Sequence, residues 1–162
     1  MKILSANEIK AWDEFTIRHE PLSSLELMER AAQKCAQWII AREWNAKQIC
    51  IFCGKANNGG DGLAIARILS QSGFAIAVYI LETEKKGSDD FETNFQSLKS
   101  TTNTNIQFIK EQNGFPSIKE KTLVIDALFG SGLNKPLEIL AANLVYHINS
   151  SKATVISIDL SS

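Results

Sequence analysis

The sequence predicts an α/β fold in which a mainly parallel β-sheet carries helices on both faces. Short apolar runs rich in Ile, Val and Leu, which suit strands buried on both faces, alternate with segments whose apolar residues follow helical spacing. Such alternation is typical of a doubly wound parallel sheet with right-handed crossovers. Polar clusters follow three of the apolar runs, and folds of this class bind ligands outside the carboxyl ends of their strands. We therefore expect a binding site at that edge of the sheet.

Length and composition indicate a single domain, residues 1–162, with a real core: 44% of the residues are hydrophobic and 22% are charged. The net charge is −1 and the basic residues are scattered, which argues against a nucleic-acid partner. No apolar run approaches the roughly 20 residues that span a bilayer, and the N-terminus does not read as a signal peptide. We expect no membrane association and a cytoplasmic location.

Two helices are predicted before the sheet. Ser5 and Glu8 form a capping box that opens a helix to about Arg18, and Ser23 with Glu26 opens a longer helix to about Trp44. The second helix carries an apolar stripe that we expect to pack against the core: Leu25, Met28, Ala32, Cys35 and Ile39.

The first strand is predicted at residues 49–53, followed by a polar, glycine-rich turn at residues 57–62 and a helix over residues 63–72. Glycines let a ligand approach the backbone closely, and the start of the next helix attracts an anion, so a nucleotide site is the first hypothesis. A Walker A loop is excluded because Gly60 and Asp61 stand where its lysine and hydroxyl belong, and the dinucleotide fingerprint fails at Ala56. A structural alternative stays open, in which the glycines only turn the chain and Asp61 caps the helix.

Two further strands are predicted in the middle of the chain, at residues 75–81, after the turn at Gly73, and at residues 106–109. Between them, Asp89 with Glu92 is expected to cap a helix that runs to about Ser100.

The fourth and fifth strands are predicted at residues 122–129 and 153–160, and each carries an aspartate near its carboxyl end, Asp126 and Asp159. Burying a carboxylate costs free energy unless the group is paired, hydrogen-bonded or bound to a cation. We therefore expect Asp126 to have a functional role. Between these strands we expect a helix with Asn134 near its cap and Pro136 in its first turn.

The cysteines and histidines are not expected to be catalytic. Three cysteines, an odd number, do not suggest a disulfide framework, and Cys50 and Cys53 should face opposite sides of a strand as small core residues. His19 falls in an interhelical turn and His147 near a helix end.

Four short sequence motifs together indicate a particular family: LMERAA at residues 27–32, NNGGDG at 57–62, DALFGSGL at 126–133 and SID at 157–159. In order and spacing they resemble the YjeF N-terminal domain family, the NAD(P)H-hydrate epimerases. The resemblance implies a Rossmann-like three-layer α/β/α sandwich, often a homodimer. It also implies interconversion of the R and S forms of NADHX and NADPHX, which are NADH and NADPH hydrated at C6 of the nicotinamide ring.

The resemblance also implies the site. Substrate contacts are expected at Asn57, Asn58, Gly59, Gly60, Asp61, Gly130, Ser131, Gly132, Leu133, Asn134, Lys135, Pro136 and Asp159, and a potassium ion at Asn58, Asp126 and Ser162. Many bacterial relatives carry a fused NAD(P)H-hydrate dehydratase, so we expect a multifunctional full-length protein and a chain truncated at its C-terminus. The sequence departs from the family's usual pattern at two places. Lys55 and Ala56 stand where the family usually has Pro-Gly, and Lys55 is suited to pair with a phosphate. Ser161 stands where the family usually has a proline.

Asp126 is the expected catalytic residue. Inversion at C6 proceeds by loss of the hydroxyl group to give a conjugated cation, which water then attacks from the other face. One carboxyl group can protonate the leaving oxygen, stabilise the cation and deprotonate the incoming water. The alternative is that Asp126 is only a metal ligand. Two other functions stay open, a non-catalytic nucleotide-binding or scaffold module and a nucleotide-dependent oxidoreductase.

Overall fold

The fold is a five-stranded, all-parallel sheet with the strand order β3-β2-β1-β4-β5, which confirms the predicted α/β class. The computed structural model describes residues 15, 23–42, 44, 46, 48–131, 133 and 136–159; the predicted helix over residues 5–18 lies outside them apart from Phe15. The elements in chain order are α2 Ser24–Ile40, β1 Gln48–Cys53, α3 Asn57–Gln71, β2 Ile76–Leu81, α4 Asp89–Thr101, β3 Asn105–Ile109, the 3-10 turn η1 Gln112–Gly114, β4 Thr122–Ala127, α5 Ile139–Asn149 and β5 Thr154–Ser157.

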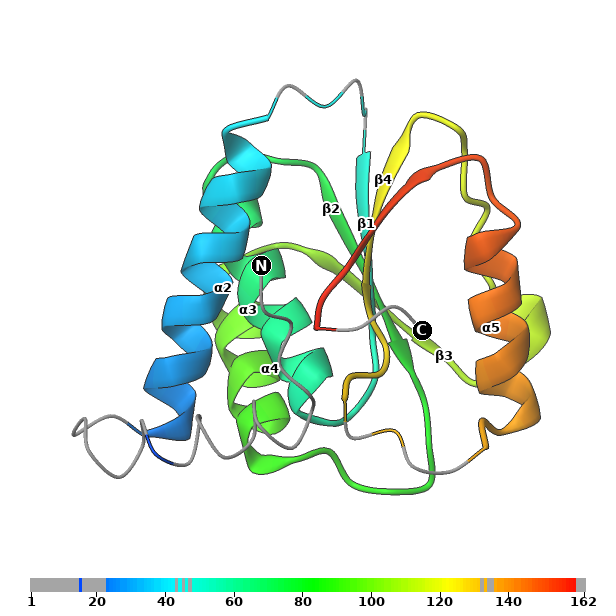
Figure 1. Ribbon diagram of the computed structural model, residues 1–162, viewed down its shortest axis with the longest axis horizontal. Helices are drawn as coiled ribbons and strands as arrows, with labels where there is room; N and C mark the ends of the chain where they lie inside the picture. The colour runs from blue at the N-terminus through cyan, green and yellow to red at the C-terminus, as the bar shows by residue number, and fades with distance from the viewer. Residues whose placement is uncertain are drawn as a thin grey trace.

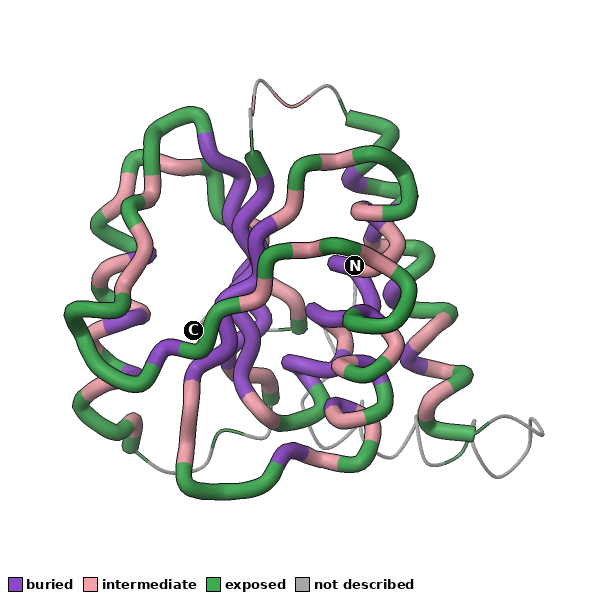
Figure 2. Tube along the Cα trace, turned by 180° about the vertical axis from the view of Figure 1, so that it is seen from behind, coloured by how far each residue is buried: buried purple, intermediate pink, exposed green. Residues whose placement is uncertain are grey.

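Helices cover the sheet on both faces, with α2, α3 and α4 on one face and α5 on the other (Figure 1). The central strands β1, β2 and β4 are buried along almost their whole length, whereas the edge strands β3 and β5 are largely exposed (Figure 2). Cys53 belongs to the core under α3 and Cys50 to the core under α5, as the alternation of a strand requires. Both thiols are free.

Helix α2 begins where the capping box predicts but ends earlier than expected. Ser23 accepts from the Glu26 amide, and the Glu26 carboxylate accepts from the Ser23 amide at 2.7 Å. The helix ends at Ile40 rather than near Trp44, because the Trp44 indole nitrogen donates to the Ile39 carbonyl at 2.8 Å and so satisfies an acceptor of the last turn.

Helix α3 begins at Asn57, so the predicted glycine-rich turn is wrong: these residues form the first helical turns. The residue before the helix, Ala56, makes no side-chain cap, and Asp61 lies inside the helix rather than at its cap. Tertiary packing explains the difference. A Cβ atom on Gly59 would lie 1.7 Å from the Gly54 carbonyl oxygen, and one on Gly62 would lie 2.6 Å from the Ala127 Cβ, so the glycines let α3 lie directly against β1 and β4.

Two other helix starts differ from the expectation. Ser88 rather than Asp89 caps α4, since its hydroxyl oxygen accepts from the Phe91 amide at 3.2 Å. Helix α5 begins at Ile139, so Pro136 lies before the helix, in a segment whose Leu137 packs against the core under α5.

The fourth and fifth strands are shorter than predicted. Strand β4 ends at Ala127, where the Asp126 carboxylate accepts from the Leu128 amide at 3.1 Å and turns the chain. Strand β5 ends at Ser157, just before Asp159, whose φ of 68° lies in the left-handed region. No helix within the described ranges has the length and apolar character needed to cross a membrane.

Candidate functional site

The candidate site lies at the carboxyl ends of β1 and β4. These two strands pair in parallel register, Phe52 opposite Asp126 and Cys53 opposite Ala127, so the loops that follow them leave the sheet side by side. The strand order reverses here, because β2 and β3 extend from β1 while β5 extends from β4. In doubly wound folds this switch point is where ligands bind.

Hydrogen bonds join three segments that are far apart in the sequence. The Asn58 side-chain amide, at the start of α3, donates to the Phe129 carbonyl at 2.7 Å. The Ser131 backbone amide donates to the Asp159 carboxylate at 2.6 Å. The motifs at residues 57–62, 126–133 and 157–159 therefore meet in one cluster.

Gly130 lies at the centre of this cluster. A Cβ atom there would lie 2.5 Å from an Asp159 carboxylate oxygen and 3.4 Å from the Asn58 Cβ. Gly130 therefore brings the loop after β4 against both the start of α3 and the end of β5.

Asp126 is buried, with 6% of its surface exposed, at the carboxyl end of β4. Alternation along the strand places it on the same face as Val124 and Leu128, which belong to the core under α5. Burial and, secondarily, the Asp126 carboxylate raise the pKa of the Cys53 thiol well above its usual range. The carboxylate thus lies close to the end of β1.

Asn58 supplies an observation that fits a cation. Its side chain is 8% exposed, and its amide oxygen has no hydrogen-bond partner within the part of the chain that the structure describes. An amide oxygen and the Asp126 carboxylate are the oxygen ligands that hard cations prefer. The third predicted ligand, Ser162, lies outside the described residues, and within them no group of three or more His, Cys, Asp or Glu side chains is arranged to hold a metal ion.

A small, mainly apolar pocket of about 240 Å³ adjoins the cluster and brings Asp61 and Asp159 together. Its other walls come from α2, α3 and the residue before Asp159: Ala31, Ala32, Cys35, Ile65 and Ile158. Burial and the Asp61 carboxylate raise the pKa of the Cys35 thiol, which disfavours a reactive thiolate there. The larger pocket, of about 300 Å³, lies at the opposite edge of the sheet and contains none of the predicted site residues.

The remaining predicted contacts fall into three groups. Asn57, Ser131, Leu133 and Pro136 are exposed at the edge of the sheet. Gly59 and Gly60 are buried, Gly60 against Met28, whose sulfur would lie 3.1 Å from an added Cβ. Gly132, Asn134 and Lys135 lie outside the described residues.

The structure adds a charged pair that sequence reasoning missed. Lys55, which was expected to suit a phosphate, forms an ion pair with Glu82 and donates to the Thr83 carbonyl at 3.3 Å. The pair joins the ends of β1 and β2 beside the start of α3. In the sequence, Glu82 follows the second strand somewhat beyond the ~20 residues at which dinucleotide-binding folds place a ribose ligand, and this spacing counted against an ordinary dehydrogenase.

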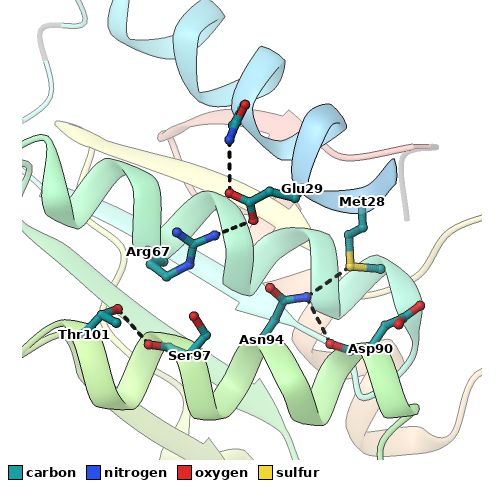
Figure 3. A network of polar contacts seen from close by, with 8 residues as sticks. Met28, Glu29, Arg67, Asp90, Asn94, Ser97 and Thr101 are labelled. Atoms are coloured by element: carbon teal, nitrogen blue, oxygen red, sulfur yellow. Dashed lines mark hydrogen bonds and ion pairs between the residues drawn. The ribbon is translucent and has the colours of Figure 1, made fainter. Parts of the chain in front are cut away.

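Side-chain contacts connect α2 to both α3 and α4 (Figure 3). Glu29 of α2 pairs with Arg67 of α3, and the Asn94 side-chain amide of α4 donates to the Met28 sulfur at 3.2 Å and to the Asp90 carbonyl at 3.0 Å. The motif at residues 27–32 therefore contributes packing and an ion pair rather than a group at the edge of the sheet.

Comparison with known proteins places this architecture in a family. The family described as YjeF-related protein N-terminus matches residues 24–162. An NAD(P)H-hydrate epimerase from Weissella koreensis is 30% identical over 98% of this chain and 69% of its own length, and one from Oenococcus oeni is 32% identical over 97% and 72%. A bifunctional NAD(P)H-hydrate repair enzyme from Thermofilum pendens is 31% identical, but this chain covers only 31% of it. The crystal structure of yeast ynu0 has the same fold, with a TM-score of 0.81 at 22% identity over 99% of this chain and 70% of that one. This chain belongs to the YjeF-related protein N-terminus family.

Proposed function

We propose that this chain is an NAD(P)H-hydrate epimerase, an isomerase that interconverts the R and S forms of NADHX and NADPHX. Relatives with that name share about 30% identity with nearly the whole chain. The observation that carries the proposal is the hydrogen-bonded cluster in which Asn58 reaches Phe129 and Ser131 reaches Asp159. These bonds unite the motifs by which the chain resembles the epimerases, at the edge where this fold binds ligands.

The start of α3 is the proposed pyrophosphate site. Its N-cap residue, Ala56, makes no side-chain cap, and both Ala56 and Asn57 are exposed. The amides of the first turn therefore have no capping side chain, and they carry the positive end of the helix dipole. Both features favour a bound phosphate group.

Asp126 is the proposed acid and base. In its protonated form it transfers a proton to the C6 oxygen, which leaves as water while the ring nitrogen lone pair forms the conjugated cation. The carboxylate then stabilises that cation and takes a proton from the water that adds to the opposite face of C6. Burial of Asp126 strengthens these interactions, because charges attract more strongly where water is excluded.

Asn58, Asp126 and Ser162 are the proposed potassium ligands, and the supporting observation is the Asn58 amide oxygen, which has no hydrogen-bond partner among the described residues. When bound, the ion would supply positive charge that offsets the Asp126 carboxylate and holds the start of α3 to the end of β4. A homodimer, a cytoplasmic location and a fused dehydratase in the full-length protein stay predictions.

The test supplies the purified chain with one epimer of NADHX in potassium buffer and follows the other by chromatography, with spontaneous epimerisation as the baseline. Asp126→Asn should lower the turnover rate roughly 100- to 10,000-fold, the usual contribution of general acid-base catalysis. Glu120→Gln, which removes an exposed carboxylate just before β4 at the opposite edge, is the matched control. Full turnover by Asp126→Asn would remove this residue from the mechanism, and wild-type turnover at the spontaneous rate would refute the function.

A potassium titration separates the two roles of Asp126. If the side chain acts as acid and base, the turnover of Asp126→Asn stays low at every potassium concentration. Recovery of turnover at high potassium would assign Asp126 to metal binding alone.

A further inference from the structure

We infer that Glu82, held in place by Lys55, binds the adenosine ribose of the substrate and selects NADHX over NADPHX. The inference rests on the proposed function and names a specificity residue for it.

The position of the pair is fixed from several sides. The Glu82 amide donates to the Ile109 carbonyl at 2.9 Å, so Glu82 continues the pairing of β2 with β3. The Lys55 carbonyl accepts from the Ser88 amide at 2.9 Å, which ties the loop after β2 to the loop after β1. The Lys55 side chain then bridges the same two loops through Glu82 and Thr83.

Polar groups follow the order of the strands along this edge. Asp126 lies at the end of β4, the uncapped start of α3 follows β1, and Glu82 follows β2. A dinucleotide has one nucleoside on each side of its pyrophosphate. With the reduced pyridine near Asp126 and the pyrophosphate at α3, the adenosine must extend over β2, which is two strand spacings, roughly 10 Å, from β4.

The carboxylate is the member of the pair that faces a ligand. The Glu82 side chain is 29% exposed and the Lys55 side chain 17%. Lys55 already donates two of its three ammonium protons to protein oxygens, whereas a carboxylate has about four acceptor positions and can take several further bonds from the ribose hydroxyls. A 2′-phosphate would bring like charge against Glu82, which disfavours the phosphorylated substrate.

The experiment compares kcat/KM for NADHX and NADPHX in the wild-type chain, in Glu82→Gln and in Glu84→Gln. Glu84 is exposed in the same loop, so its variant makes the same charge change away from the pair. Wild type should prefer NADHX at least about tenfold, and Glu82→Gln should lower that preference by roughly ten- to a hundredfold, the value of a hydrogen bond to a charged group. Glu84→Gln should keep the wild-type ratio. Because each ratio is taken within one protein, partial misfolding does not change it.

A wild-type preference for NADPHX, or an unchanged ratio in Glu82→Gln, would overturn the inference while leaving the epimerase function intact. Binding of adenosine 5′-monophosphate and adenosine 2′,5′-bisphosphate, measured by calorimetry, tests the same selection without turnover. The monophosphate should bind more tightly to the wild-type chain, and Glu82→Gln should reduce that difference. A chain that shows this selection but does not epimerise would refute only the proposed function.

Discussion

Gly59→Ala tests whether the glycines of α3 serve chain packing. The added Cβ would lie 1.7 Å from the Gly54 carbonyl oxygen, whereas real Cβ contacts do not fall below about 3.0 Å, so the helix and the strand must part by about 1.3 Å. Gly54 is itself closely surrounded, because its amide donates to the Ala127 carbonyl and a Cβ added to it would lie 2.1 Å from the Leu128 carbonyl oxygen. Overpacking typically costs 1–3 kcal/mol or more, and alanine regains about 1 kcal/mol of helix propensity. Because the overlap is large, we expect a cost at the upper end of that range and a net loss of about 2 kcal/mol.

Urea unfolding followed by circular dichroism measures this loss as a lower midpoint at unchanged slope. Gly114→Ala is the control, because nothing lies within 4 Å of its Cβ position; its free energy of unfolding should stay within about 0.5 kcal/mol of wild type. If Gly59→Ala unfolds at the wild-type midpoint, close packing does not require this glycine, and the explanation of why α3 begins at Asn57 fails with it.

Two further predictions concern the site and the core. In Gly130→Ala the added Cβ lies 2.5 Å from the Asp159 carboxylate, which belongs to an exposed side chain that can turn away. The hydrogen bond from the Ser131 amide to Asp159 is then lost, so kcat/KM for epimerisation should fall at least about tenfold. The melting temperature should change by less than about 4 °C, and unchanged kinetics would show that this bond does not shape the site. Burial raises the pKa of Cys50 from 9.0 to about 11, so the folded state favours the protonated thiol. That stabilisation is present below pH 9 and is lost as the pH rises toward 11. Cys50→Ala should therefore lose less stability than wild type over this range. Parallel curves of unfolding free energy against pH would show that the Cys50 pKa is not raised in the folded state.

Local patterns sufficed to predict that five strands form, though not the ends of the last two, and to predict the start of α2. The strand at residues 49–53 is an uninterrupted apolar run, and Ser23 with Glu26 is a capping box whose two bonds lie within four residues. The start of α3 was beyond local reasoning, because glycine lowers helix propensity and the compensating contacts are with Gly54 and Ala127.

The site was predicted at the level of topology but not of contacts. Because ligands bind at the carboxyl edge in this fold class, the loops after three strands were predicted to lie together. The structure has Asn58, Gly130 and Asp159 from these loops in one cluster. Which atoms meet depends on loop paths that no periodicity encodes. Lys55 and Glu82 illustrate the limit, since a bond between side chains 27 residues apart follows only once β1 and β2 are known to be neighbours.

Packing and the site are coupled through the same glycines. Asn58 reaches the Phe129 carbonyl only because α3 lies directly against β1 and β4, and that approach depends on the missing side chains of Gly59 and Gly62. A side chain at either position would move the start of α3, and with it the amides proposed to bind the pyrophosphate. Substitutions at these two glycines should therefore lower stability and activity together, whereas Gly130, whose neighbour is a movable carboxylate, is the position where activity can be lost while the fold persists.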